Sequence, residues 1–146
     1  MPREGQGLSI TDPYTHSIQW SRRFVGLKAF LSLATAGWAG YARVIEHQAE
    51  MGELLRKKLA ENGWEITNDT PLPLVCFNNA DSEFDIGQCQ RIVDTVIRSG
   101  RAWISTIQLG RAKRPAIRAC ITNFRTRPQQ IDLLINELSQ ARALVQ

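Results

Sequence analysis

The sequence predicts an α+β domain in which helices pack on one face of a mainly antiparallel sheet. Apolar residues recur at helical spacing in three segments, and four short segments are rich in residues that favour strands. Their order along the chain is α-β-β-α-β-β-α. The length of 146 residues suits one domain, and 43% hydrophobic with 22% charged residues is the composition of an ordinary globular protein.

The first predicted helix follows an extended lead-in, because residues 1–20 hold two glycines, two prolines and no sustained period. Apolar residues then recur at helical spacing on one face between residues 27 and 59. They are Leu27, Phe30, Leu31, Ala34, Trp38, Tyr41, Ile45, Met51, Leu54, Leu55 and Leu59. Gly37 and Gly40 predict a bend or break in this helix. Asn62 and Gly63 predict its end, since both residues tolerate a left-handed conformation.

The next three predicted elements are two strands and a helix. Residues 64–67 and 74–77 read as strands around a turn that contains two prolines. Ser82, with Asp85 three residues later, indicates the start of a helix that runs to Gly100. Its buried stripe is Ile86, Cys89, Val93 and Val96.

Two more strands and a last helix complete the order. Residues 103–109 and 116–122 are rich in Ile, Trp and Thr and are joined by a hairpin loop over 110–115. Thr126 and Gln129 form a capping-box pattern, and Pro128 suits the first turn of a helix. The core face of this helix is Ile131, Leu134, Ile135 and Leu138.

The cysteines, the hydropathy and the charge indicate the cellular compartment and the kinds of partner to expect. Cys76, Cys89 and Cys120 are isolated from one another, which predicts free thiols in a reducing compartment and a cytoplasmic location. No apolar run reaches the ~18–20 residues of a membrane span, so we expect no membrane partner. The net charge of +4 is modest and the arginines are spread along the chain, so we expect no nucleic-acid partner. A nucleic-acid binder would have to use Arg111, Lys113, Arg114, Arg125 and Arg127.

The sequence contains few candidates for catalytic residues or metal ligands. None of its four lysines, Lys28, Lys57, Lys58 and Lys113, has a setting that would depress an amine pKa. His47 is a single helical histidine, which is not a metal site. Asp81, Glu83 and Asp85 are explained by a favourable interaction with a helix dipole. We therefore predict no catalytic residue and no metal ligand.

Three segments nevertheless resemble a known enzyme family. They are Ser-Ile-Gln-Trp-Ser-Arg-Arg-Phe-Val-Gly-Leu-Lys-Ala-Phe-Leu at 17–31, Thr-Pro-Leu-Pro-Leu-Val-Cys-Phe at 70–77 and Ile-Arg-Ala-Cys-Ile-Thr-Asn at 117–123. Their order and spacing resemble the C-terminal portion of the group II amino-acid decarboxylases, which depend on pyridoxal 5'-phosphate (PLP) and act on aromatic amino acids or glutamate. The similarity covers essentially the whole chain after the first ten or so residues.

The resemblance implies both a place in a larger enzyme and a missing part. Residues 1–22 would end the cofactor domain, and residues 23–146 would form the small C-terminal domain of a fold-type I PLP enzyme, a sheet with helices on its outer face. The family's aldimine lysine follows a histidine, whereas His16 and His47 precede Ser17 and Gln48. We therefore expect this carboxy-lyase domain to be inactive alone and to bind no PLP by itself. Its expected partners are a second copy, a large PLP-binding domain and, in the complete enzyme, an amino-acid substrate. The alternative is a non-catalytic remnant that associates with itself or with another protein.

The resemblance also supplies candidate site residues. Trp20 and Ser21 match a loop that approaches the PLP phosphate of the neighbouring subunit, although Ser21 could instead cap the first helix. Arg118 matches an arginine that meets the substrate carboxylate in some relatives, and a structural ion pair is the competing explanation. Arg22 and Arg23 are expected to form salt bridges between domains or subunits.

Overall fold

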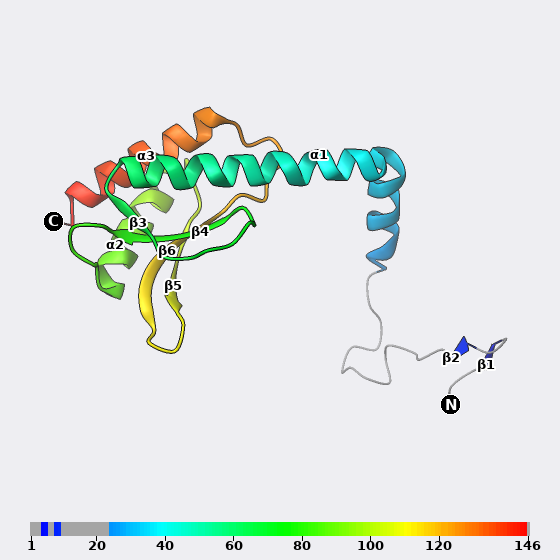
Figure 1. Cartoon of the computed structure of the whole chain (residues 1–146), viewed down its shortest axis with the longest axis horizontal. Coiled ribbons are helices and arrows are strands. Elements are labelled where there is room, and N and C mark those ends of the chain that lie inside the picture. Colours follow the sequence, from blue (N-terminus) through cyan, green and yellow to red (C-terminus); the bar gives the residue numbers. More distant parts are fainter. Residues whose placement is uncertain (1–3, 6–7, 10–23, 146) are drawn as a thin grey trace. The chain divides into compact units, whose positions relative to one another are not determined.

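The computed structural model describes residues 4–5, 8–9 and 24–145 (Figure 1). The chain divides into two compact units, Met1–Ala39 and Gly40–Gln146. Helix α1, Gly26–Glu61, contributes residues to both units. The candidate sites described below all lie in the second unit.

The first unit contains a short strand pair and the beginning of α1. Strands β1, Glu4–Gly5, and β2, Leu8–Ser9, pair antiparallel within the segment that was expected to be extended. The backbone of α1 is non-helical at Gly37, where φ is 65° and ψ is 173°. Almost only glycine adopts this conformation, so the predicted break is confirmed at Gly37. Leu33 is half-buried, whereas the other large apolar side chains described in this unit are exposed, namely Phe24, Val25, Leu27, Phe30, Leu31 and Trp38.

The second unit is built on a four-stranded antiparallel sheet. Its strands are β3, Trp64–Ile66, β4, Leu74–Asn79, β5, Ser105–Leu109, and β6, Arg114–Cys120. Their order across the sheet is β3-β4-β6-β5, so the last strand in sequence lies between two earlier ones. Val75 lies opposite Ala119, and Phe77 lies opposite Ile117. The predicted strands and their antiparallel pairing are confirmed.

Helices cover one face of this sheet. Besides the residues of α1 from Gly40 on, they are α2, Ile86–Arg98, and α3, Pro128–Ala143. One hydrophobic core joins them to the sheet and includes Leu55 and Leu59 of α1, Ile92 and Val96 of α2, Ile131 and Leu138 of α3, and Val75, Phe77, Ile117 and Ala119 of the sheet. Alternation along β4 and β6 turns every second side chain toward the helices. The predicted α+β class, with helices on one face, is confirmed.

The helix starts differ in detail from the prediction. Asp85 is the N-cap of α2, and its capping partner is Gln88: Gln88 N donates to Asp85 Oδ1 at 2.7 Å, and Asp85 N donates to Gln88 Oε1 at 3.0 Å. The capping pair of α3 lies one residue later than Thr126 and Gln129. Because Pro128 occupies the first helical position, the cap falls on Arg127, whose N–H donates to Gln130 Oε1 at 2.9 Å.

The end of α3 holds the turn between α1 and β3. Arg142 donates from Nη1 to Gly63 O at 3.0 Å and from Nη2 to Asn62 O at 2.8 Å. Its guanidinium also lies 4.8 Å from the ring centroid of Trp64. Trp64 in turn packs edge-on against Phe77, with the ring centroids 5.3 Å apart. Asn62 and Gly63 follow the last residue of α1, as predicted, and Gly63 has a φ of 75°.

Candidate functional site

Arg118 lies on the face of the sheet opposite the helices. Its neighbours along β6, Ile117 and Ala119, belong to the core, so Arg118 projects to the other face. Cys76 of β4 and Ser105 of β5 are its partners across the sheet. We call these three residues the polar row. The orientation of Arg118 agrees with the prediction from strand alternation.

The guanidinium of Arg118 makes one hydrogen bond, from Nε to Ser105 Oγ at 3.2 Å. The side chain is half-buried, and no carboxylate in the described ranges forms an ion pair with it. A guanidinium has five N–H donors, and most of those on Arg118 have no protein acceptor among the described residues. The structural ion pair that was the competing explanation is therefore absent from this part of the chain. The geometry leaves Arg118 able to bind an anion.

The thiol of the polar row is a structural group. Burial raises the pKa of Cys76 above its usual range, and the nearby guanidinium groups of Arg118 and Arg56 only partly oppose this effect. Cys76 is therefore a neutral thiol at pH 7, and a thiol is a poor nucleophile compared with a thiolate. The polar row can bind and orient a ligand, but it contains no general base or nucleophile.

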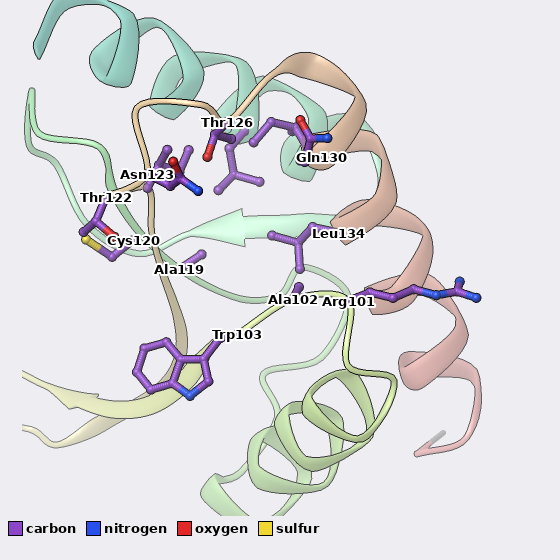
Figure 2. Close-up of a pocket in the computed structure, with 13 residues that line it drawn as sticks. Arg101, Ala102, Trp103, Ala119, Cys120, Thr122, Asn123, Thr126, Gln130 and Leu134 are labelled. Atoms are coloured by element: carbon purple, nitrogen blue, oxygen red, sulfur yellow. The ribbon is translucent and has the colours of Figure 1, made fainter. Parts of the chain in front are cut away.

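A cavity of about 370 Å³ lies where β5 and β6 separate. The pairing of these strands ends at Ser105 and Arg118, and beyond it the chain segments around Trp103 and Asn123 line the cavity (Figure 2). Its apolar lining includes Leu55, Ile131 and Leu134, whereas Thr122, Asn123, Thr126 and Gln130 contribute polar groups. This mixture of an apolar lining and a few polar groups is typical of a small-molecule site.

The ionisable groups in this lining do not suggest catalysis. They are Arg101, which pairs with the buried carboxylate of Glu137 at 2.8 Å, and the exposed thiol of Cys120. The lining contains no lysine, histidine or carboxylate. The cavity therefore has the character of a binding site without acid–base groups.

The four lysines lie elsewhere in the molecule. Lys57 pairs with Glu61 at 3.9 Å, and Lys58 pairs with Asp132. Lys28 is an exposed residue of α1, and Lys113 lies in the turn between β5 and β6 with a φ of 51°. None of them lines the cavity of Figure 2.

The remaining predictions concern the cofactor loop and a metal site. Trp20, Ser21, Arg22 and Arg23 lie outside the described residues. Within the described ranges, no group of three or more His, Cys, Asp or Glu side chains could hold a metal ion. His47 instead contacts the main chain, with its Nε2 atom 2.7 Å from Thr126 O.

The basic residues proposed for nucleic-acid binding do not share one surface. Arg111 and Lys113 lie in the β5–β6 hairpin, and Arg114 begins β6, whereas Arg125 and Arg127 follow the other end of β6. A strand of seven residues separates the two groups by about 20 Å. Arg114 is also paired with Glu83 at 3.2 Å. The structure therefore gives no continuous basic groove through these residues.

Comparison with known proteins gives the family. Residues 4–80, just over half of the chain, match the pyridoxal-dependent decarboxylase conserved domain. The chain belongs to this family. The resemblance carried by segments 17–31 and 70–77, which fall within the match, is therefore confirmed.

Individual members of the family extend the similarity beyond the matched residues. An aromatic-L-amino-acid decarboxylase from Bacillus atrophaeus is 29% identical over an alignment of 120 positions that covers 78% of this chain and 25% of that protein. The fold is shared with solved structures of glutamate decarboxylase from Lactobacillus brevis, with a TM-score of 0.75 and 19% identity, and of TDC from Oryza sativa with PLP and tryptamine, with a TM-score of 0.75 and 16% identity. The alignments cover 99% and 93% of this chain but 33% and 30% of those structures. The chain thus spans between a quarter and a third of the length of these relatives.

No helix among the described residues is long and apolar enough to cross a membrane.

The cavity of Figure 2 was not predicted from the sequence. Its lining comes from α1, the segment before β5, the end of β6 and the start of α3, which are far apart along the chain. The sequence feature that relates to this cavity is Trp103, a large aromatic residue at the start of an expected strand. In the fold this side chain is 70% exposed. An exposed Trp beside a strand end indicates a cavity only after the partner segments are known.

Proposed function

We propose that this chain forms the C-terminal domain of a PLP-dependent amino-acid decarboxylase, a carboxy-lyase, and that it is inactive alone. Residues 1–22 would end the cofactor domain and residues 23–146 would form the small domain. The observation that carries the proposal is a family match in a chain that spans a quarter to a third of its relatives. The proposed lack of activity is consistent with the positions of the four lysines, since none lines the cavities of about 370 and 400 Å³.

Arg118 is the residue that we assign to the substrate. Its half-buried guanidinium has one protein hydrogen bond and therefore retains donors for a carboxylate. Trp20 and Ser21 are assigned to the cofactor phosphate by the resemblance alone. In the complete enzyme, PLP would supply the electron sink for the loss of CO₂, and the residues of this chain would bind and orient.

Partners and location follow from the same proposal. The domain would associate with a large PLP-binding domain and form a homodimer in the complete enzyme. The three cysteines are free in the structure, which supports a reducing, cytoplasmic location.

Borohydride trapping tests whether the chain binds PLP alone. The purified chain is titrated with PLP, reduced, digested and mapped by mass spectrometry. We expect low, unselective labelling of the exposed amines of Lys28, Lys57 and Lys113, without a saturable change in absorbance. Selective labelling of one lysine at stoichiometric PLP would contradict the inactive-domain proposal. A Lys→Arg variant at the labelled position is the control.

A non-catalytic remnant that associates with itself is the second candidate. The exposed side chains of Phe24, Leu27, Phe30, Leu31 and Trp38 favour it, because exposed apolar residues of this size promote association. The coding sequence that precedes the chain separates the two candidates. A preceding frame with a His-Lys pair would support the enzyme, whereas its absence, together with concentration-dependent association in sedimentation velocity, would support the remnant.

A further inference from the structure

A second cavity, of about 400 Å³, is lined by cationic side chains. It lies between α1 and the segment that leads into α3, and its lining residues are His47, Phe124, Arg125 and Arg127. None of these residues belongs to the polar row or to the cavity of Figure 2. Neither the family resemblance nor the proposed decarboxylase function assigns a role to it.

The lining carries positive charge without a compensating carboxylate. Within the described part of the chain, Arg125 and Arg127 form no ion pair, whereas Arg56, Arg101 and Arg114 each have an acidic partner. The nearest acidic residues along α1, Glu46 and Glu50, do not line the cavity. Asp132 of α3 is paired with Lys58. The two guanidinium groups at this cavity therefore have no carboxylate partner among the described residues.

The protein holds the lining in place through its main chain. His47 donates from Nε2 to Thr126 O, 2.7 Å away, which leaves Nδ1 as the second polar atom of the ring. Arg125 N donates to Asn123 Oδ1 at 2.9 Å, and the capping bond of Gln130 fixes the main chain of Arg127. Gln48 Nε2 donates to Thr122 O at 2.7 Å and ties the same segment to α1. The cationic groups thus project from an ordered loop.

Phe124 adds an apolar wall to the cavity. The guanidinium carbon of Arg125 lies 5.4 Å from the centroid of its ring, a distance at which a cation and an aromatic face attract each other. The ring is 56% exposed, so part of it remains available to a ligand. An apolar surface beside two guanidinium groups suits an anion that carries an organic group.

We propose that this cavity binds a small organic phosphate. Arg125 and Arg127 would hold the phosphate oxygens, and Phe124 would contact the organic part. A phosphate dianion matches two guanidinium charges better than a single carboxylate does, and it offers enough oxygens for both forks. The volume of the cavity lies in the range of small-molecule sites. The proposal does not depend on decarboxylase activity.

Titration of the ¹⁵N-labelled full chain by NMR tests the site, with phenyl phosphate, inorganic phosphate and benzoate as probes. We expect saturable shifts at residues 124–130 and at His47, with phenyl phosphate bound more tightly than either other probe. Arg125→Gln and Arg127→Gln should each weaken binding about tenfold, which corresponds to the loss of one charge-assisted contact. Phe124→Ala should abolish the preference over inorganic phosphate.

Arg111→Gln is the matched control, because it removes one exposed arginine from the β5–β6 hairpin. Its affinity for phenyl phosphate should stay within about twofold of the parent, since an exposed charge ~20 Å away is screened. An equal loss in this variant would show that binding depends only on net charge and would overturn the site. Equal affinity for benzoate, or shifts that do not saturate, would overturn the assignment to organic phosphates. Preserved peak dispersion in each variant shows that the fold is intact.

Discussion

Arg118 and Arg56 are two arginines of one unit with different surroundings. Arg118 has one hydrogen bond, to Ser105. Arg56 bonds Glu53 and the carbonyl groups of Thr70, Leu72 and Leu74 at 2.8–3.1 Å. If the unpaired donors of Arg118 serve to bind a ligand, replacing Arg118 should affect the stability of the isolated chain much less than replacing Arg56.

We therefore expect Arg118→Met to lower the free energy of unfolding by no more than about 1 kcal/mol, the value of one net hydrogen bond. Arg56→Met, the matched variant, should cost about 2–3 kcal/mol because it removes four hydrogen bonds, including the one to Glu53 and the one to Thr70 O, which has no other described donor. Urea unfolding followed by circular dichroism measures both. A loss of 3 kcal/mol or more in Arg118→Met would indicate a structural role and would count against the assignment to a substrate carboxylate.

The buried thiol of Cys89 should make the free energy of unfolding fall as the pH becomes alkaline. Burial, with a smaller contribution from the charge of Asp85, raises the pKa of its thiol from 9.0 to about 11. The folded state therefore holds this proton more tightly than the unfolded state. The resulting stability is fully present below pH 9 and is lost as the pH rises toward 11, by up to about 1.4 kcal/mol per pH unit.

Urea midpoints of the parent and of Cys89→Ala between pH 8 and 10.5 check this expectation. The variant should lose less stability than the parent as the pH rises, whatever its stability at pH 8. Cys120→Ala, which changes an exposed thiol, should keep the parent's slope. Parallel slopes for the parent and Cys89→Ala would show that the thiol titrates alike in both states.

For single residues, the sequence predicted on which face of the sheet a side chain lies, but it did not predict the contacts of that side chain. Strand alternation was enough to place Arg118 on the face opposite Ile117 and Ala119. Its bond to Ser105 was not predictable, because the register between β5 and β6 depends on where the hairpin turns. Trp20 and Ser21 remain predictions, since they lie outside the described residues.

Helix α2 depends on a reciprocal cap at its start. Asp85→Ala removes the acceptor for Gln88 N and should lower the free energy of unfolding by about 1 kcal/mol. Asp81→Ala is a suitable control, because it removes an exposed carboxylate from the same loop without a described hydrogen bond. Urea unfolding of both variants gives the comparison. Equal effects would mean that the charge near the helix, and not the cap, stabilises α2.

The elements themselves were predictable, but some of their ends were not. Helical periodicity identified the helices of the second unit, and runs of strand-favouring residues bounded by turns identified its strands. The start of α3 was misplaced by one residue, since the pattern Thr126–Gln129 fits a capping box as well as sequence alone can judge. The decisive constraint was steric: Pro128 fits the first helical position, and the cap must precede it.

No described residue before Gly40 belongs to the core of the second unit. The members of this core run from Met51 to Ala141, and apart from the half-buried Leu33 the described large apolar side chains of 24–39 are exposed. A chain of residues 40–146 should therefore unfold cooperatively, with a free energy of unfolding within about 1 kcal/mol of the full chain, since surface contacts contribute little.

Urea unfolding of the full and the shortened chains, monitored by Trp fluorescence, measures this difference. The fluorescence should report mainly on Trp64, which is buried in both proteins. A broad, non-cooperative transition in the shortened chain would show that residues 1–39 are required for the folded state.

The sheet order has a consequence for synthesis on the ribosome. β6 lies between β4 and β5 but is made after both, so β4 has an open edge until residues 114–120 leave the ribosome. The turn after α1 waits still longer, because Arg142 closes it from the far end of α3. The nascent chain therefore cannot complete this core before α3 has been made. A premature stop that removed only the last turn of α3 would leave Trp64 without its cationic partner. It would also remove the Arg142 donor to Asn62 O and one of the two donors to Gly63 O.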